Sequence, residues 1–310
     1  MRVFLLSVSL PLLLSVSASA MQTAGAPVAQ APMAAPLAVV QDTSKTPLAS
    51  AFSFPTGVAV GTNGTVYVVD TDNSEIKKVS ATGQVSSLAK HGFTYPTGVA
   101  VDASGTVYVA DAGSRSIKKV TPAGEVSTLV EHGLDYPAGV AVTADGTVYV
   151  VDAGREANTG SIRKLTPGGR LMTLAKGFNK PNGVAVAADG TVYVADTDNN
   201  CIKKISLAGE VSALVGASLN RPAGVAIAPD GTVYAADTYN NGVQKIGITG
   251  SAILLASGFT YPAGVAVDAA GAVYVTDTGH SALKKIALTG QVSTLVEGTV
   301  GTAASIVSKQ

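Results

Sequence analysis

The sequence contains six copies of one pattern of roughly 41 residues, and this repeat constrains the fold more than any single residue does. Each copy opens with Pro-x-Gly-Val-Ala and reaches a Val-Tyr run that ends in an aspartate 15 residues after the proline. A basic pair and a glycine turn follow in most copies. The six opening prolines are Pro55, Pro96, Pro137, Pro181, Pro222 and Pro262. A period of this length indicates small units that each pack against their neighbours.

Each copy contains four short runs of β-branched or aromatic residues separated by turn residues, which predicts a four-stranded meander. In the first copy these runs lie near 58–60, 66–69, 76–79 and 85–88. Asn-Gly or Asp-Gly pairs in the first turn favour tight hairpins. The runs are apolar almost without alternation, so both faces of each sheet must be covered. A closed ring of sheets meets this need, and we expect an all-β, six-bladed β-propeller of four-stranded antiparallel blades.

Two segments compete to close the predicted ring. Residues 46–51 precede the first copy and are placed to dock as a strand on the last blade. Residues 292–296 form a Val-Ser-Thr-Leu-Val run that is equally suited to be the outer strand of that blade. The repeat pattern alone leaves both alternatives open.

The segments outside the repeats have compositions of their own. Residues 1–20 combine Arg2, an apolar stretch and a small-residue Ala-Ser-Ala end, which predicts a secretory signal peptide. Residues 21–45 are rich in Ala and Pro, as in a semi-extended linker. We expect the propeller over 46–300 and a C-terminal tail over 301–310. The mature protein is expected to be secreted or periplasmic, with no membrane span.

The charge balance argues against some partners. The chain has 21 Lys and Arg and 21 Asp and Glu, so no global field draws it to nucleic acid or to an anionic membrane. Cys201 is the only cysteine, which excludes an intrachain disulfide. Its slot holds small residues in other copies, and we interpret it as an inert residue at a strand edge.

The copies resemble the NHL repeat. The resemblance is carried by Pro-x-Gly-Val-Ala-Val, Gly-x-Val-Tyr-Val-x-Asp and Asn-x-x-Ile-Lys-Lys, which stand in phase over about residues 51–297. It implies a six-bladed propeller used mostly for binding, including the extracellular sensor domains of some bacterial receptor kinases. The chain shows no kinase sequence, so signalling within the same chain does not follow.

The resemblance also implies that one end of the ring is the binding face, where the loops before the prolines and the loops between second and third strands emerge. Aromatic rings beside cationic groups suit sugar rings or carboxylate-bearing ligands. The alternative is that the aromatic residues only cover the mouth of the ring and the cations are solvated. The candidate ligand-binding residues are Phe54, Tyr95, Tyr136, Lys180, Arg221 and Tyr261, together with Arg155 in a four-residue insertion of the third copy.

Three other sets of polar residues are interpreted as structural. The six strand-ending aspartates are expected to accept backbone N–H bonds from the loop that follows them. The basic pairs on the third strands are expected to form an outer belt with their charged ends in water, an anionic wall polymer being the functional alternative. His91 and His132 occupy outer positions of adjacent blades, so we expect no metal site and no catalytic residue among these groups. The aspartates are Asp70, Asp111, Asp152, Asp196, Asp237 and Asp277.

Together these features favour an exported, non-catalytic binding or scaffold protein that presents a loop-rich face to a protein or an envelope glycan, without a cofactor. The alternative is a metal-dependent lactonase- or lyase-type enzyme, because six-bladed relatives include such enzymes. That alternative needs Glu, Asn, Asp or His clustered at the mouth of the axis. The chain has only six glutamates and none lies in a predicted inner strand.

Overall fold

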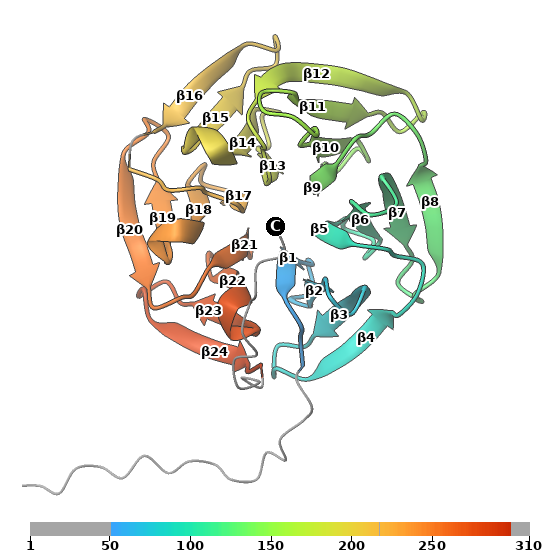
Figure 1. Ribbon diagram of the computed structural model, residues 1–310. Helices are drawn as coiled ribbons and strands as arrows, with labels where there is room; N and C mark the ends of the chain where they lie inside the picture. The colour runs from blue at the N-terminus through green and yellow to red at the C-terminus, as the bar shows by residue number, and fades with distance from the viewer. Residues whose placement is uncertain (1–50, 217, 299–310) are drawn as a thin grey trace, which may run out of the picture. The chain divides into compact units, whose positions relative to one another are not determined.

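The computed structural model describes residues 51–216 and 218–298, which form six four-stranded antiparallel sheets arranged as a ring (Figure 1). Within each sheet the strands follow chain order from the axis to the circumference. The predicted all-β, six-bladed propeller is therefore confirmed. The predictions for residues 1–20, 21–45 and 301–310 lie outside the described residues.

The first three blades take their four strands in sequence. Blade 1 comprises β1 (Pro55–Val60), β2 (Val66–Asp70), β3 (Glu75–Val79) and β4 (Val85–Ala89). Blade 2 comprises β5 (Pro96–Val101), β6 (Val107–Asp111), β7 (Ser116–Val120) and β8 (Val126–Val130). Blade 3 comprises β9 (Pro137–Val142), β10 (Val148–Asp152), β11 (Gly160–Leu165) and β12 (Leu171–Phe178).

The last three blades add a single 3-10 turn between their second and third strands. Blade 4 comprises β13 (Val184–Val186), β14 (Val192–Asp196), η1 (Thr197–Asn199), β15 (Cys201–Ile205) and β16 (Val211–Val215). Blade 5 comprises β17 (Val225–Ile227), β18 (Val233–Asp237), η2 (Thr238–Asn240), β19 (Gly242–Ile246) and β20 (Ala252–Ser257). Blade 6 comprises β21 (Pro262–Val267), β22 (Val273–Asp277), η3 (Thr278–His280), β23 (Ala282–Ile286) and β24 (Val292–Val296). In the part of the chain that the structure describes, no helix is long and apolar enough to cross a membrane.

The glycine of each Pro-x-Gly opening lets the inner strands approach one another around the axis. A Cβ atom on Gly98 would lie 2.5 Å from the carbonyl oxygen of Ala138 in the next blade, and one on Gly139 would lie 2.3 Å from that of Asn182. Real Cβ atoms do not come this close to a backbone oxygen. The repeated glycine is therefore a condition for closing the ring at this radius.

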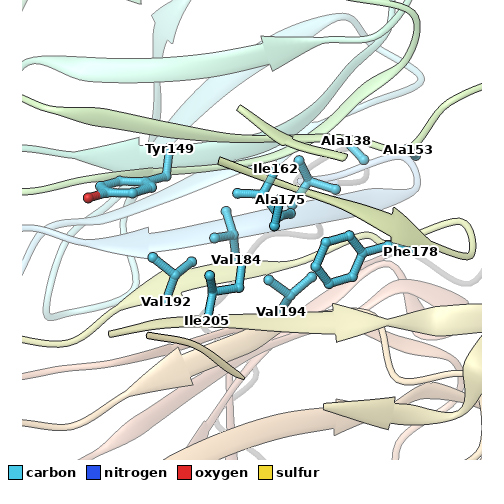
Figure 2. Packing of buried hydrophobic residues seen from close by; sticks show 11 residues of the cluster. Ala138, Tyr149, Ala153, Ile162, Ala175, Phe178, Val184, Val192, Val194 and Ile205 are labelled. Atoms are coloured by element: carbon cyan, nitrogen blue, oxygen red, sulfur yellow. The ribbon is translucent and has the colours of Figure 1, made fainter. Parts of the chain in front are cut away.

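The hydrophobic core is divided into clusters that lie between neighbouring blades. Between blades 3 and 4, Tyr149 and Ile162 pack against Val184, Val194 and Ile205 (Figure 2). Each fully buried aliphatic side chain contributes about 1.5–3 kcal/mol relative to its exposed state. This packing explains why the second strands are buried at all five positions, since a blade covers both of its faces with its neighbours.

Blade 6 closes the ring with its own fourth strand, β24, which pairs with β23. The prediction that residues 292–296 supply the outer strand of this blade is confirmed, while of residues 46–51 only Ala51 lies among the described residues. The seam between blades 6 and 1 contains the buried Phe52. The hydroxyl groups of Thr276 and Thr278 donate across it to the carbonyls of Thr56 and Pro55, each at 2.6 Å.

Candidate ligand-binding face

The strand-ending aspartates hold the loops that carry the predicted ligand-binding residues. Asp111 and Asp152 are buried, and each accepts a 2.8 Å bond from the backbone N–H of the residue before its proline, Tyr95 and Tyr136 respectively. In blade 4, Asp196 accepts the N–H of Asn179 at 2.7 Å. The predicted structural role is confirmed but the predicted donor was wrong, because these N–H groups belong to the loop that enters the blade and not to the following loop. The following turn instead contributes side chains, such as the Asn199 amide at 2.8 Å.

In most blades, the first residue of the basic pair on the third strand also contacts the buried aspartate. Lys77 and Lys203 lie 2.5 Å from Asp70 and Asp196, and their side chains are only 13% and 21% exposed. In blade 5, the amide of Gln244 donates to Asp237 at 3.1 Å, so the one non-basic residue keeps a donor in this slot. The expected belt of solvated charges was therefore wrong for these positions. A buried carboxylate is costly without such a partner, which explains the repeated Asp and Lys.

A central cavity of about 770 Å³ opens at the end of the ring where the entry loops lie. Its walls are the backbone and small side chains of the six inner strands, such as Gly57 and Val58. Aromatic side chains that are 39–53% exposed line this cavity near its mouth: Phe54, Tyr95, Tyr136, Tyr239 and Tyr261. Tyr239 packs edge to face on Tyr261, with ring centroids 5.6 Å apart. The mouth therefore offers flat apolar faces over a channel whose described lining contains one charged residue, Asp72.

A second cavity of about 750 Å³ lies off the axis at the same end, between the loops of blades 2 to 5. Its charged lining consists of Arg115, Asp135, Arg155, Lys180, Asp198 and Arg221. We call it the cationic hollow, because four basic side chains face two carboxylates. Tyr136, Ala138 and Asn182 line both this hollow and the central cavity, so the two spaces share a wall.

The cations of the hollow differ in how they are held. Lys180 donates from Nζ to the carbonyls of Gly154 at 3.1 Å and Arg155 at 2.5 Å, and so holds the insertion of blade 3. Arg221 pairs with Asp198 at 2.8 Å and lies over the Tyr239 ring at 5.1 Å from its centroid. These contacts hold this part of the cationic hollow in a defined shape without a ligand.

Burial also affects two neutral groups near the site. The pKa of Tyr136 is raised by burial and, to a lesser degree, by its neighbour Tyr95, so its hydroxyl stays protonated at neutral pH. Burial likewise raises the pKa of the Cys201 thiol, an effect that Asp196 strengthens. A protonated, buried thiol is a poor nucleophile, which agrees with the interpretation of Cys201 as inert.

All seven candidate residues lie at this end of the ring, but in two groups. Phe54, Tyr95 and Tyr261 line the central cavity, Arg155, Lys180 and Arg221 line the cationic hollow, and Tyr136 lines both. The repeat pattern did not predict Arg115, Asp198 and Tyr239 as site residues; they lie between the second and third strands of their blades. Tyr239 had a signal, since it is the one tyrosine outside the two slots that the repeat explains.

The residues of the face do not fit a metal centre. Among residues 51–216 and 218–298, no group of three or more His, Cys, Asp or Glu side chains is placed to hold a metal ion. Asp72 is the one charged residue in the described lining of the central cavity. His280 is committed to Asp277, with Nδ1 at 2.7 Å from the carboxylate, while His91 and His132 are exposed elsewhere.

The fold and the repeat together define the class of the protein. The NHL repeat model matches residues 52–79, 93–119, 178–205, 219–246 and 259–286. The unmatched blade is blade 3, which carries the four-residue insertion. The chain is therefore a six-bladed β-propeller in which five blades match the NHL repeat model, while the likeness to sensor domains of receptor kinases stays an expectation.

Solved structures with the same fold include proteins of different activities. A gluconolactonase from Xanthomonas campestris is 20% identical over 79% of this chain and 88% of its own, with a TM-score of 0.67. A streptogramin B lyase is 17% identical over 80% and 84%, with a TM-score of 0.61. A propeller in a nidogen/laminin complex is 19% identical over 73% and 93%, with a TM-score of 0.65. At such identities these likenesses establish the fold, and no curated protein matches the sequence.

Proposed function

We propose that the protein is an exported, non-catalytic binding module that presents this end of the ring to a protein or glycan partner. The observation that carries the proposal is the pair of adjoining cavities, one with aromatic residues near its mouth and one lined by cations. Aromatic faces and guanidinium groups bind partners through stacking and charge-assisted hydrogen bonds without any reactive group. The matching chain of the nidogen/laminin complex offers a parallel, because its structure was solved bound to a protein partner.

The rival function is a metal-dependent lactonase or lyase, as the activities of two structural neighbours suggest. The carboxylates described in the two linings are Asp72, Asp135 and Asp198, and they form no cluster that suits a divalent cation. We therefore favour binding. Metal analysis of the purified protein checks this choice: we expect no stoichiometric calcium or zinc, and finding either would favour the enzyme.

The binding role is tested with a Lys180→Gln/Arg221→Gln double variant in a pull-down from the cell envelope and on a glycan array. We expect the wild-type protein to capture a partner and the double variant to lose it, since both cations line the same hollow. The matched control is Lys204→Gln/Lys245→Gln, which removes the same charge from the third strands of blades 4 and 5. Loss of capture in the control alone would place binding on the outer belt and contradict the proposal.

A further inference from the structure

The cationic hollow has more positive charge than its own carboxylates neutralise. It contains four basic side chains and two aspartates, and within the described part of the chain Arg221 and Asp198 form the one ion pair among them. Lys180 is bonded to backbone carbonyls, which leaves its charge uncompensated. The guanidinium groups of Arg115 and Arg155 are exposed, and neither has an ion-pair or hydrogen-bond partner among the described residues. Two such groups facing one concavity attract an anion.

These two arginines depart from the repeat, so the fold does not require them. The slot of Arg115 holds Ser74, Asn200, Asn241 and Ser281 in other blades, all in the left-handed backbone region. At φ 55°, arginine is less suited to this region than the asparagine that two other blades use. Arg155 lies in the insertion that only blade 3 contains. Both departures border the same hollow, which points to a ligand.

The shape of the hollow favours a short stretch of ligand that also stacks on an aromatic ring. A volume of about 750 Å³ lies within the usual range for small-ligand sites. Tyr136 forms part of its wall and is 41% exposed, so its ring is available to an apolar face of a ligand. A carboxylate on that ligand would lie within the field of the two free guanidinium groups.

A carboxylated sugar fits this combination better than an acidic peptide. Extended peptides are usually bound through backbone hydrogen bonds to a strand edge, and helical ones through an apolar groove. All described lining residues of the hollow except Ala138 lie in loops or in η1, so no strand edge faces it. A uronic acid offers instead a C–H face for stacking and a carboxylate on the same ring.

We propose that the cationic hollow binds an acidic glycan, with a uronic-acid ring against Tyr136 and carboxylates on Arg115 and Arg155. The proposal rests on the binding function proposed above and specifies the ligand class for the same face. Neighbouring carboxylated sugars extend from the hollow across the shared wall toward the aromatic mouth. Increasing salt weakens the complex, because the contacts are exposed ion pairs.

Titration calorimetry with hexagalacturonate tests the proposal on the purified protein. We expect binding of the unesterified form, whose carboxylates are ionised, and no binding of the fully methyl-esterified form, which keeps the sugar rings but has no charge. An Arg115→Asn/Arg155→Gln variant should bind roughly tenfold more weakly or worse, as loss of charge-assisted hydrogen bonds implies. The asparagine has precedent in the same slot at Asn200 and Asn241. The matched control, Arg170→Gln/Lys176→Gln, removes the same charge from exposed positions of blade 3 outside both cavities and should bind within about twofold of wild type.

Three results would overturn the acidic-glycan proposal. These are equal binding by the Arg115→Asn/Arg155→Gln variant, tighter binding of hexaglutamate than of hexagalacturonate, and no binding of the unesterified form at all. The envelope pull-down with Lys180→Gln/Arg221→Gln separates this failure from that of the general function. If partner capture still depends on Lys180 and Arg221, the binding face stands and only its ligand class is rejected.

Discussion

At the scale of single residues, the molecule depends on contacts that leave no room for another atom. The inner-strand glycines lie against the carbonyl oxygens of the next blade, and a Cβ there would approach to between 2.3 and 2.7 Å. The buried aspartates have an equally strict requirement: each accepts N–H bonds from its entry loop, and most also have partners in the turn and on the third strand, as at Asp196. A small change at either kind of position therefore acts on a whole blade.

Gly139→Ala should destabilise the protein by about 1–3 kcal/mol or more, because its Cβ would lie 2.3 Å from the Asn182 oxygen and force two blades apart. Urea unfolding measures the change. Gly168→Ala is the control: its Cβ would meet nothing closer than the Thr166 hydroxyl at 3.9 Å, so the free energy of unfolding should change by less than about 0.5 kcal/mol. Equal stability of the two variants would contradict the close-packing account.

At the scale of elements, the first hairpin of each blade shows how local sequence specifies a turn. In blade 3, the backbone N–H of Gly146 donates to the carbonyl oxygen of Thr143 at 2.9 Å, and Gly146 has a φ of 81°. Asp145 accepts the hydroxyl of Thr143 at 2.6 Å and the N–H of Thr147 at 3.0 Å. These hydrogen bonds lower the pKa of Asp145 below its ordinary value of 3.8, and the bond from the Thr143 hydroxyl has the largest effect.

This turn predicts a specific acid sensitivity. A pKa that is lower in the folded state means that the carboxylate stabilises the fold fully above pH 3.8, and that this contribution is lost as the pH falls through the folded value. Thr143→Ala should raise the pKa of Asp145 toward 3.8, as measured by NMR titration of the carboxyl. Asp230 is the internal control, because its pKa is lowered mainly by the backbone N–H of Thr232 and should not move. An unchanged pKa at Asp145 would show that the Thr143 bond does not persist in solution.

The elements also show the limit of reasoning from one repeat. Strand number, strand order and hairpin turns are predictable, because each strand and each turn is specified by its own residues and the pattern repeats in phase. The prediction that the lysine ammonium groups lie in water was wrong at Lys77, because its contact with Asp70 depends on the register of β3 against β2. The donors of the aspartates were misassigned for a related reason, since Asn179 precedes Asp196 by 17 residues.

At the scale of the whole molecule, the ring has no distinct closing device in its described part. Blade 6 completes its own sheet, and the hydroxyl–carbonyl bond from Thr278 to Pro55 across the seam has counterparts between other blades, such as Thr238 to Pro262 at 2.8 Å. The seam is thus built like the other interfaces. Two residues far apart in the chain meet there by the same contacts as neighbours do elsewhere.

Thr278→Val and Thr238→Val should therefore cost the same free energy of unfolding, about 1–2 kcal/mol each, because each leaves one buried carbonyl without its donor. Urea unfolding compares the two. Thr294→Val, at an exposed position of β24, is the control and should change stability by less than about 0.5 kcal/mol. A much larger cost at Thr278 would identify the seam as a weak point of the ring.

The sequence by itself determined the period, the number of blades, the four strands of each blade and the slot from which Lys180 and Arg221 enter the site, because these follow from local patterns repeated in phase. Only the tertiary structure decided which strand closes the ring, which cations pair with buried aspartates, and that Arg115 joins Arg155 at one hollow. Those contacts depend on how the strands and blades are arranged around the axis, and some join residues far apart in the chain, such as Thr56 and Thr276 at 220 positions and Pro55 and Thr278 at 223.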